Sequence, residues 1–244
     1  MKQRYVNFIV ILLMAAAVPE PAFCAETATS GLRTPSEHYE YIIRPLSDTA
    51  RVHESKIVFE LYKENGVILL TKKSSQDERG ELIDIRVKDD GTFITGTRQY
   101  EDRPDYLESI SLRAGTVLTA RGSLKSGKIK HLRLEPGKLF AADISLLYLF
   151  RNFPFGRGVQ WDVLMMDFSR YSITVAAKES GEELVKVPAG EFECYRMEVT
   201  VNALLIHPKI TYWLSKDPPH FLVKHIGKVG PFTRQFITEL VKRD

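Results

Sequence analysis

The chain has 244 residues, of which 34 are basic and 31 are acidic, and its formal net charge at pH 7 is +3. A charge so close to balance, without a basic cluster that carries interleaved aromatic residues, argues against a nucleic-acid partner. Hydrophobic residues make up 44% of the chain, which is enough for one sizeable core.

The first 25 residues have the composition of a secretory signal peptide. Lys2 and Arg4 form a basic start, Tyr5–Val18 is an apolar run, and Ala-Phe-Cys-Ala follows at 22–25. The apolar run has 14 residues, whereas a transmembrane helix needs about 20. We therefore expect export to the periplasm or secretion, with no stable transmembrane span.

Cleavage is expected after Cys24 or after Ala25, and the sequence leaves both sites open. A lipoprotein signal places Leu and two small residues before its cysteine, and Pro-Ala-Phe at 21–23 does not match, so we do not expect a lipoprotein. Either cut leaves a single thiol, at Cys194, and a formal charge of +2 because two basic residues and one acidic residue are removed.

Residues 26–36 are polar and rich in turn formers, so we expect a flexible leader before one β-rich domain at 37–244. Within this domain apolar and polar residues alternate, as at Ile57, Phe59 and Leu61, which is typical of strands that bury one face. Turn sequences separate the runs: Asn65-Gly66, Asp90-Gly91, Ser126-Gly127, Ser180-Gly181, Pro188-Ala189-Gly190, Asp217-Pro218-Pro219 and Val229-Gly230-Pro231. They predict about ten to twelve strands joined as antiparallel hairpins.

One stretch, Asp143–Asn152, has helical spacing. Ile144, Leu147 and Tyr148 share a face behind a candidate N-cap at Asp143. Other apolar residues fill most of the remaining circumference, so this helix needs cover on several sides. We therefore predict an all-β fold, a strongly curved antiparallel sheet or incomplete up-and-down barrel, with this one helix packed on its concave side.

Gly122–Ile129, GSLKSGKI, has the glycine and lysine spacing of a phosphate-binding loop. That loop requires Ser or Thr directly after the lysine and a helix that begins there. Here Ile129 takes that place, and IKHLRL continues as a strand pattern. We therefore expect no nucleotide site.

Six histidines raise the question of a metal site. His220 and His225 are the closest pair, but an offset of five puts them on opposite faces of a strand. The others, His38, His53, His131 and His207, lie far apart in the chain. No Gly-x-Ser-x-Gly elbow is present, and no carboxylate spacing favours a catalytic pair. We predict no metal, no cofactor and no catalytic residue.

Cys194 lies in KVPAGEFECYRMEV, residues 186–199. In a strand after the Pro188-Ala189-Gly190 turn, Met197 and Val199 belong to the more apolar face, and Cys194 lies on the opposite face with Phe192. A nucleophilic thiol needs a base or a positive site that lowers its pKa. Arg196 is on the same face, but no histidine is near in sequence, so we favour packing over reactivity.

The second half resembles a bacterial exported family named domain of unknown function 3108. The likeness lies in Asp143-Ile144-Ser145, Tyr148, Phe150-Arg151, Pro154-Phe155, Gly158, the Tyr171 strand, Val187–Phe192, Tyr212-Trp213-Leu214-Ser215 and Glu239-Leu240-Val241. It implies a periplasmic β-rich protein and brings no established reaction or active-site residues. The Asp217-Pro218-Pro219-His220 turn departs from the commoner pattern of the family.

Large apolar side chains occupy both faces of the last strands, with Tyr212 beside Trp213 and Phe221 beside Leu222. Our first hypothesis is a non-enzymatic envelope protein of unknown function whose curved sheet shelters an apolar ligand, a lipid or acyl chain, in a groove under the helix. The candidate groove residues are Leu147, Phe150, Tyr212, Trp213 and Phe221. Ordinary packing of both faces is the competing interpretation.

The second hypothesis is a scaffold or assembly factor that binds an envelope protein through a sheet edge. The third is a hydrolase whose residues converge only in the fold. Oligomeric state does not follow from the sequence.

Overall fold

The chain builds one long curved sheet. The computed structural model describes residues 34–47, 54–75, 80–123, 126–168, 172–202, 207–228 and 234–244; it does not describe the side chains of residues 123–129. Thr34–Asp244 is a compact unit by itself. The predicted signal peptide with Cys24, residues 26–33 of the leader, His53 and the Val229-Gly230-Pro231 turn lie outside these ranges. No helix in the described ranges is long and apolar enough to cross a bilayer.

The described residues form fifteen strands and one helix. The strands are β1 Glu37–Pro45, β2 Ser55–Glu64, β3 Val67–Ser74, β4 Glu81–Lys88, β5 Phe93–Tyr100, β6 Arg103–Arg113, β7 Thr116–Ser123, β8 Ser126–Arg133, β9 Leu139–Ala142, β10 Gln160–Met166, β11 Ser172–Val187, β12 Gly190–Asn202, β13 Lys209–Ser215, β14 Leu222–Lys228 and β15 Gln235–Arg243, and the helix is α1 Ser145–Phe150. The predicted fold class, a curved antiparallel sheet with one helix, is confirmed.

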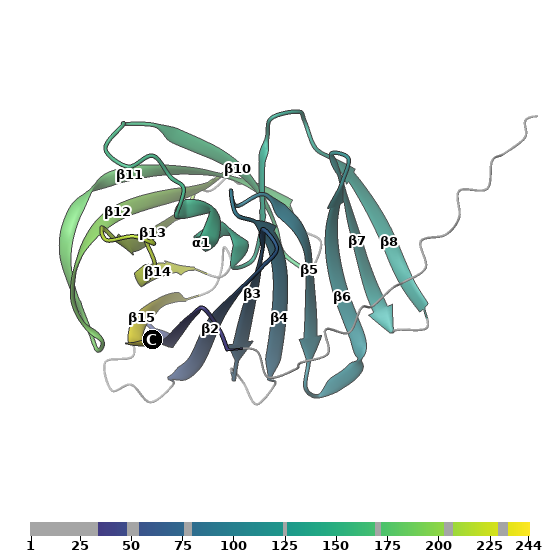
Figure 1. The fold of residues 1–244 in the computed structure, drawn as a ribbon, viewed down its shortest axis with the longest axis horizontal. Helices are drawn as coiled ribbons and strands as arrows, with labels where there is room; N and C mark the ends of the chain where they lie inside the picture. The colour runs from purple at the N-terminus through teal and green to yellow at the C-terminus, as the bar shows by residue number, and fades with distance from the viewer. Residues whose placement is uncertain are drawn as a thin grey trace, which may run out of the picture. The chain divides into compact units, whose positions relative to one another are not determined.

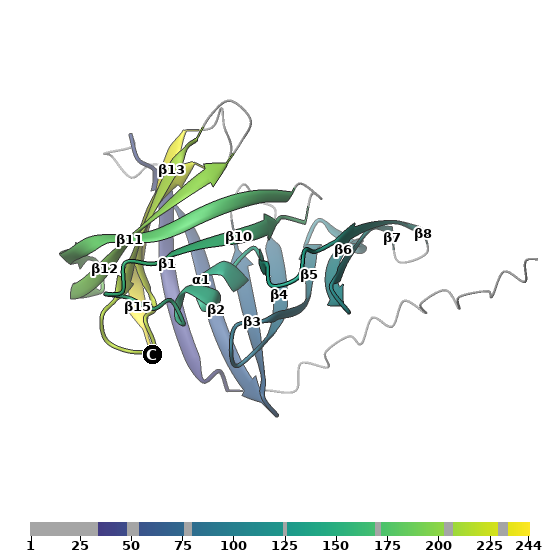
Figure 2. The ribbon, with the colours of Figure 1, turned by 90° about the horizontal axis from the view of Figure 1, so that it is seen from above.

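The strand order is β8-β7-β6-β5-β4-β3-β2-β1-β15-β14-β13-β12-β11-β10-β9. Neighbouring strands are antiparallel except β9 and β10, which are parallel. The first and last strands of the sequence, β1 and β15, are therefore neighbours in the middle of the sheet. Figures 1 and 2 show the sheet curving around α1, and we call the face toward α1 the inner face.

Tight turns join many of the strands, and two predicted turns need correction. Asn65 and Gly66 have φ of 50° and 75°, the left-handed conformation that a two-residue hairpin requires, and they join β2 to β3. Ser180-Gly181 is not a turn but lies inside the 16-residue strand β11, where the register shifts as in a β-bulge. Ser126-Gly127 is also not a turn, because both residues belong to β8.

The core beneath α1 comes from alternate residues of β1–β4. Tyr41 pairs with Ile57, Leu61 with Leu70, and Leu70 with Ile85, so these side chains share the inner face, and all are buried. Full burial of one such side chain contributes about 2 kcal/mol. An apolar floor of this kind requires a cover, and α1 supplies it.

Helix α1 is shorter than predicted, at Ser145–Phe150 rather than Asp143–Asn152. Asp143 is not its N-cap: the cap position is Ile144, without a side-chain hydrogen bond, and Asp143 has a φ of 44°. The Asp143 carboxylate instead accepts hydrogen bonds from Lys72 on β3. Asp143 therefore forms an ion pair with Lys72, which is distant in sequence, and not the expected N-cap of α1.

Candidate functional site

A narrow apolar cleft lies between α1 and strands β1–β3, and we call it the α1 cleft. Its floor is built from buried side chains of the sheet: Tyr39, Tyr41, Leu61, Leu70 and Leu222. The alternation of these strands turns every second side chain inward, so Tyr39 and Tyr41 both point into the cleft. Phe59 and Ile144 complete its apolar lining.

The rim of the α1 cleft is formed by the helix. Leu147 and Tyr148 are half-buried there, and Arg151 follows at the end of the helix. The cavity has a volume of about 30 Å³, which is the space that about one water molecule occupies in the liquid. The interior under the helix is therefore nearly filled by side chains.

An ion pair fixes the start of α1 to the sheet. The Lys72 Nζ lies 3.0 Å and 3.2 Å from the two carboxylate oxygens of Asp143, and 3.5 Å from Glu81 Oε2. Burial by itself lowers the pKa of Lys72, but the carboxylates of Asp143 and Glu81 outweigh this and raise it. Lys72 is therefore charged at neutral pH.

A second ion pair holds the end of the helix. Arg151 Nη1 donates to both oxygens of Glu37, at 3.1 Å and 2.9 Å, and Nη2 lies 3.5 Å from the Tyr39 hydroxyl. The Tyr39 hydroxyl also donates to Glu37. Burial and this hydrogen bond raise the pKa of Tyr39 to about 12, so its proton stays available for donation.

Of the five predicted groove residues, Leu147 lines the α1 cleft. Phe150 is fully buried and meets the ring of Tyr212 edge-on at 5.7 Å. Trp213 points to the outer face with Lys224, and its indole nitrogen donates to Glu183 at 2.9 Å. Phe221 does not line the cleft but stacks on Tyr39 of its floor at 5.6 Å. Their contact with a ligand remains a prediction.

A row of alternating charges crosses the inner face from β3 to β7, and sequence analysis missed it. Its members are Lys72, Glu81, Arg98, Glu108 and Arg121, which we call the charge row. Arg98 Nε lies 2.6 Å from Glu108, and Arg121 Nε lies 2.8 Å from the other oxygen of the same carboxylate. With Asp143 the charges cancel, so the row creates no strong field. Only the register across five strands reveals it.

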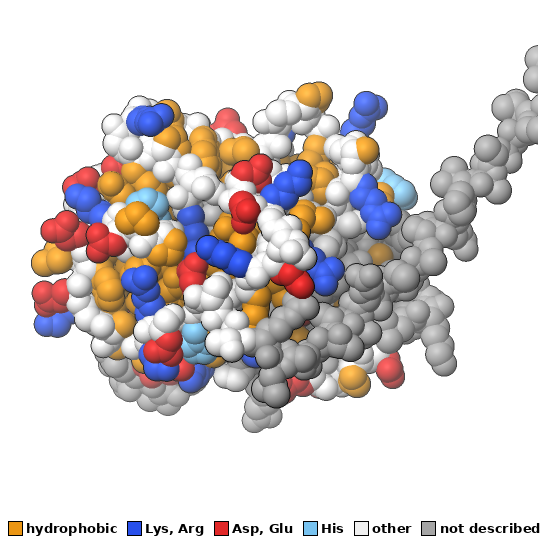
Figure 3. Space-filling view, in the orientation of Figure 1, with side chains coloured by type: hydrophobic (Ala, Val, Ile, Leu, Met, Phe, Trp, Pro, Cys, Tyr) orange, Lys and Arg blue, Asp and Glu red, His pale blue; other side chains and the backbone are white. Residues whose placement is uncertain are grey.

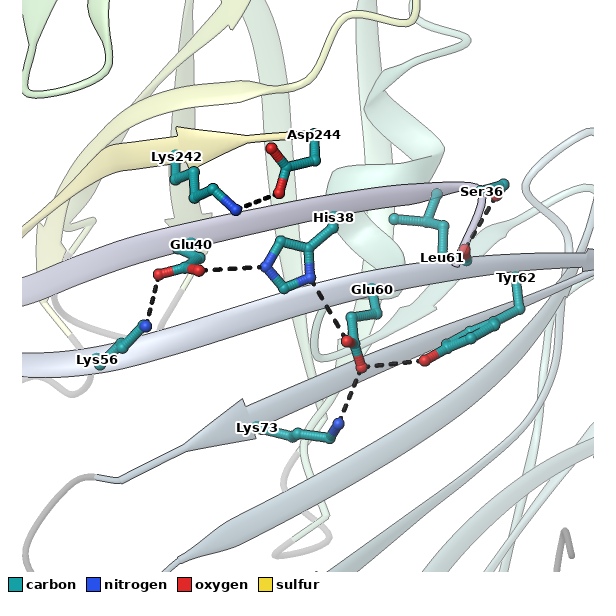
Figure 4. A network of polar contacts seen from close by, with 10 residues as sticks. All are labelled: Ser36, His38, Glu40, Lys56, Glu60, Leu61, Tyr62, Lys73, Lys242 and Asp244. Atoms are coloured by element: carbon teal, nitrogen blue, oxygen red, sulfur yellow. Dashed lines mark hydrogen bonds and ion pairs between the residues drawn. The ribbon is translucent and has the colours of Figure 1, made fainter. Parts of the chain in front are cut away.

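The outer face of β1–β3 carries a second polar network (Figure 4). His38 lies between two carboxylates, 3.4 Å from Glu40 and 3.5 Å from Glu60, which are paired in turn with Lys56 and Lys73. Of these residues, Glu60 also borders the α1 cleft. Figure 3, which views the face of Figure 1, shows basic and acidic side chains interspersed with apolar ones.

A larger, shallower depression of about 710 Å³ lies beside Lys56, Lys73, Leu82 and Gln99. It adjoins the connection between β3 and β4, of which residues 76–79 lie outside the described ranges. Its lining is mostly polar and charged, so it lacks the apolar character of the α1 cleft. We therefore regard the α1 cleft as the candidate site.

The residues considered for catalysis or metal binding take structural positions. Cys194 is buried, and burial together with Glu183 raises its pKa to about 12, which makes the thiol a poor nucleophile. The glycine-lysine segment continues into β8 rather than into a helix. Across the described ranges, no group of three or more His, Cys, Asp or Glu side chains is placed to hold a metal ion.

No protein-family model matches the chain, and no curated protein matches it. The hypothetical lipoprotein YmcC from Escherichia coli (K12) is a similar solved structure, with 13% identity, a TM-score of 0.38 and 84% of each chain covered. A protein of YmcC-like fold from Bacteroides fragilis NCTC 9343 has 11% identity and a TM-score of 0.37, with 87% of this chain and 97% of that chain covered. Likenesses of this degree assign no function, and membership of domain of unknown function 3108 stays a prediction.

Proposed function

We propose that this chain is an exported, non-enzymatic envelope protein that shelters an apolar ligand, a lipid or acyl chain, in the α1 cleft. The observation that carries the proposal is the lining of the cleft, which consists mainly of aromatic and aliphatic side chains from both the helix and the sheet, with Glu60 and Arg151 as its charged members. The signal-like composition of residues 1–25 supports export. The buried Cys194 and the outer-face position of His38 offer no reaction centre at this cleft.

The cleft must widen to admit an acyl chain, because its present volume of about 30 Å³ is far too small for one. Leu147 and Tyr148 are the half-buried residues on the cleft side of α1. Leu146, Leu149 and Phe150 are buried in the core and hold the helix in place. Rotation of the two rim side chains therefore opens the cleft without unfolding α1.

Lipid extraction of the purified mature protein, followed by mass spectrometry, tests the proposal directly. We expect a co-purifying single-chain lipid, and we expect a fluorescent polyene fatty acid, parinaric acid, to gain fluorescence on titration with the protein. Absence of both signals would refute the proposal.

Two substitutions locate the binding site. Leu61→Trp places a bulky ring on the cleft floor and should abolish the fluorescence gain, whereas Leu147→Ala widens the rim and should strengthen binding. Leu184→Trp is the matched control, because Leu184 is 65% exposed on β11. Equal binding by all three variants would place the ligand elsewhere.

A second candidate function is strand addition at β8, which is an end of the sheet. The described chain offers no strand to the free edge of β8, and Lys130, His131 and Arg133 are exposed along it. An extended segment of an envelope protein could pair there through its backbone. A photo-crosslinker at position 131 should capture one protein in cells, and the same group at Glu191 should not.

A further inference from the structure

Two arginines from distant parts of the chain meet beside Tyr39 at one end of the α1 cleft. The Arg151 guanidinium lies 5.9 Å from the centre of the Tyr39 ring, and Tyr39 stacks on Phe221 at 5.6 Å. The Arg243 guanidinium lies 4.2 Å from the centre of the Phe221 ring. Tyr39 and Arg243 are register partners across β1 and β15, so their side chains share a face. Two stacked rings thus hold one cation each.

The charges at this end of the cleft are unbalanced. Two cations, Arg151 and Arg243, and one carboxylate, Glu37, lie beside Tyr39. Glu37 is bound through a single nitrogen of Arg151, Nη1, rather than through the two-nitrogen fork of the guanidinium. In the described part of the chain Arg243 forms no ion pair with a carboxylate. One positive charge is therefore available for an anion.

We infer that this end of the α1 cleft binds the anionic head group, a carboxylate or a phosphate, of a single-chain amphiphile. The inference rests on the proposed function and adds the head group to it. The apolar lining accepts the tail, while a charged head group requires a partner that pairs with it. Arg151 lines the α1 cleft, and Arg243 lies over Phe221, which stacks on Tyr39 of the cleft floor. A guanidinium matches either oxyanion.

Titration with parinaric acid and with parinaryl alcohol, which has the same tail and an uncharged head, tests the inference. We expect the acid to bind about tenfold more tightly than the alcohol, because the binding free energy contributed by a hydrogen bond to a charged group corresponds to a ratio of about that size. Arg243→Gln should bring the affinity for the acid down to that for the alcohol and leave the alcohol unaffected. Arg133→Gln, an exposed arginine on β8, is the matched control and should change neither.

Competition with oleic acid and with oleoyl lysophosphatidic acid then separates a carboxylate from a phosphate. Equal affinity of the wild type for acid and alcohol would overturn the head-group inference and leave the cleft proposal standing. If Arg243→Gln lowers the affinities for the acid and for the alcohol by the same factor, the head-group inference is likewise overturned and the cleft proposal still stands. Failure of both probes to bind would instead overturn the proposed function and the inference with it.

Discussion

The α1 cleft and the charge row lie on the same inner face of one sheet, yet they are built from opposite chemistry. Beneath the helix the inward side chains are apolar, as at Tyr41 and Leu70, because α1 covers them. Along the charge row they are acidic or basic residues, and Glu108 is 1% exposed between two arginines. Cover by an apolar helix favours apolar side chains, whereas Glu108 reaches low exposure because both neighbouring arginines pair with its carboxylate.

The largest effect is expected from loss of the helix anchor on the apolar side. Phe150→Ala should lower the free energy of unfolding by about 4 kcal/mol, because it leaves a cavity against Tyr212. Urea unfolding followed by fluorescence measures this. Leu184→Ala, at an exposed position on β11, should change stability by less than about 0.5 kcal/mol. If Phe150→Ala lowers the free energy of unfolding by less than about 1 kcal/mol, α1 does not act as the cover of the apolar core beneath it.

Removal of one charge from the charge row should lower the free energy of unfolding almost as much as Phe150→Ala does. Glu108→Gln leaves Arg98 and Arg121 without their shared carboxylate, and we expect a loss of about 3 kcal/mol. The control is Glu191→Gln, whose partner Lys186 is exposed, and it should change stability by less than about 0.5 kcal/mol. Similar values for the two variants would show that the row contributes no more than a surface pair.

One titratable ring lies within the apolar side and makes it sensitive to acid. His225 stacks on Tyr212 at 4.7 Å, and burial lowers its pKa to about 4. Between pH 6.5 and 4 the unfolded chain binds a proton at this ring and the folded chain does not, so stability falls as the pH falls through this range.

We expect this loss to be about 2 kcal/mol in the wild type between pH 7 and pH 4.5. His225→Phe keeps the stacking and should remove that part of the pH dependence, whereas His131→Gln at an exposed position should retain it. Unfolding measured at both pH values provides the comparison. A parallel pH dependence of the wild type and His225→Phe would contradict the assignment.

The smallest effect is expected at the rim of the α1 cleft. Leu147→Ala should lower the free energy of unfolding by about 1 kcal/mol, because its side chain is only half-buried. The contrast with Phe150→Ala distinguishes the ligand side of α1 from its anchoring side. Equal losses at both positions would show that the helix has no ligand side.

Period-two alternation and turn sequences predicted the all-β fold because both are local. The predicted count of about ten to twelve strands was too low, even though Ser180-Gly181 looks like a turn and would have added a strand; a bulge instead lets β11 continue through it. Asp143 looked like a helix cap because its partner Lys72 is 71 residues away. Local patterns do not report contacts of that separation.

The candidate site was predictable at Leu147 but not at its charged end. Glu37, Arg151 and Arg243 come together only because β1 pairs with β15 and α1 lies across them. The faces of the last strands were also ambiguous, since the register shifts between Trp213 and Leu214. A one-residue shift moves a side chain to the opposite face of a sheet.

The pairing of β1 with β15 makes the charged end of the α1 cleft depend on a contact between strands that lie far apart in the sequence. Glu37 and Tyr39 belong to β1, whereas Arg243 belongs to β15. A chain in which these two strands have not yet paired therefore lacks both the central seam of the sheet and half of the proposed head-group site. Capture of a charged amphiphile would then report that the sheet is fully assembled.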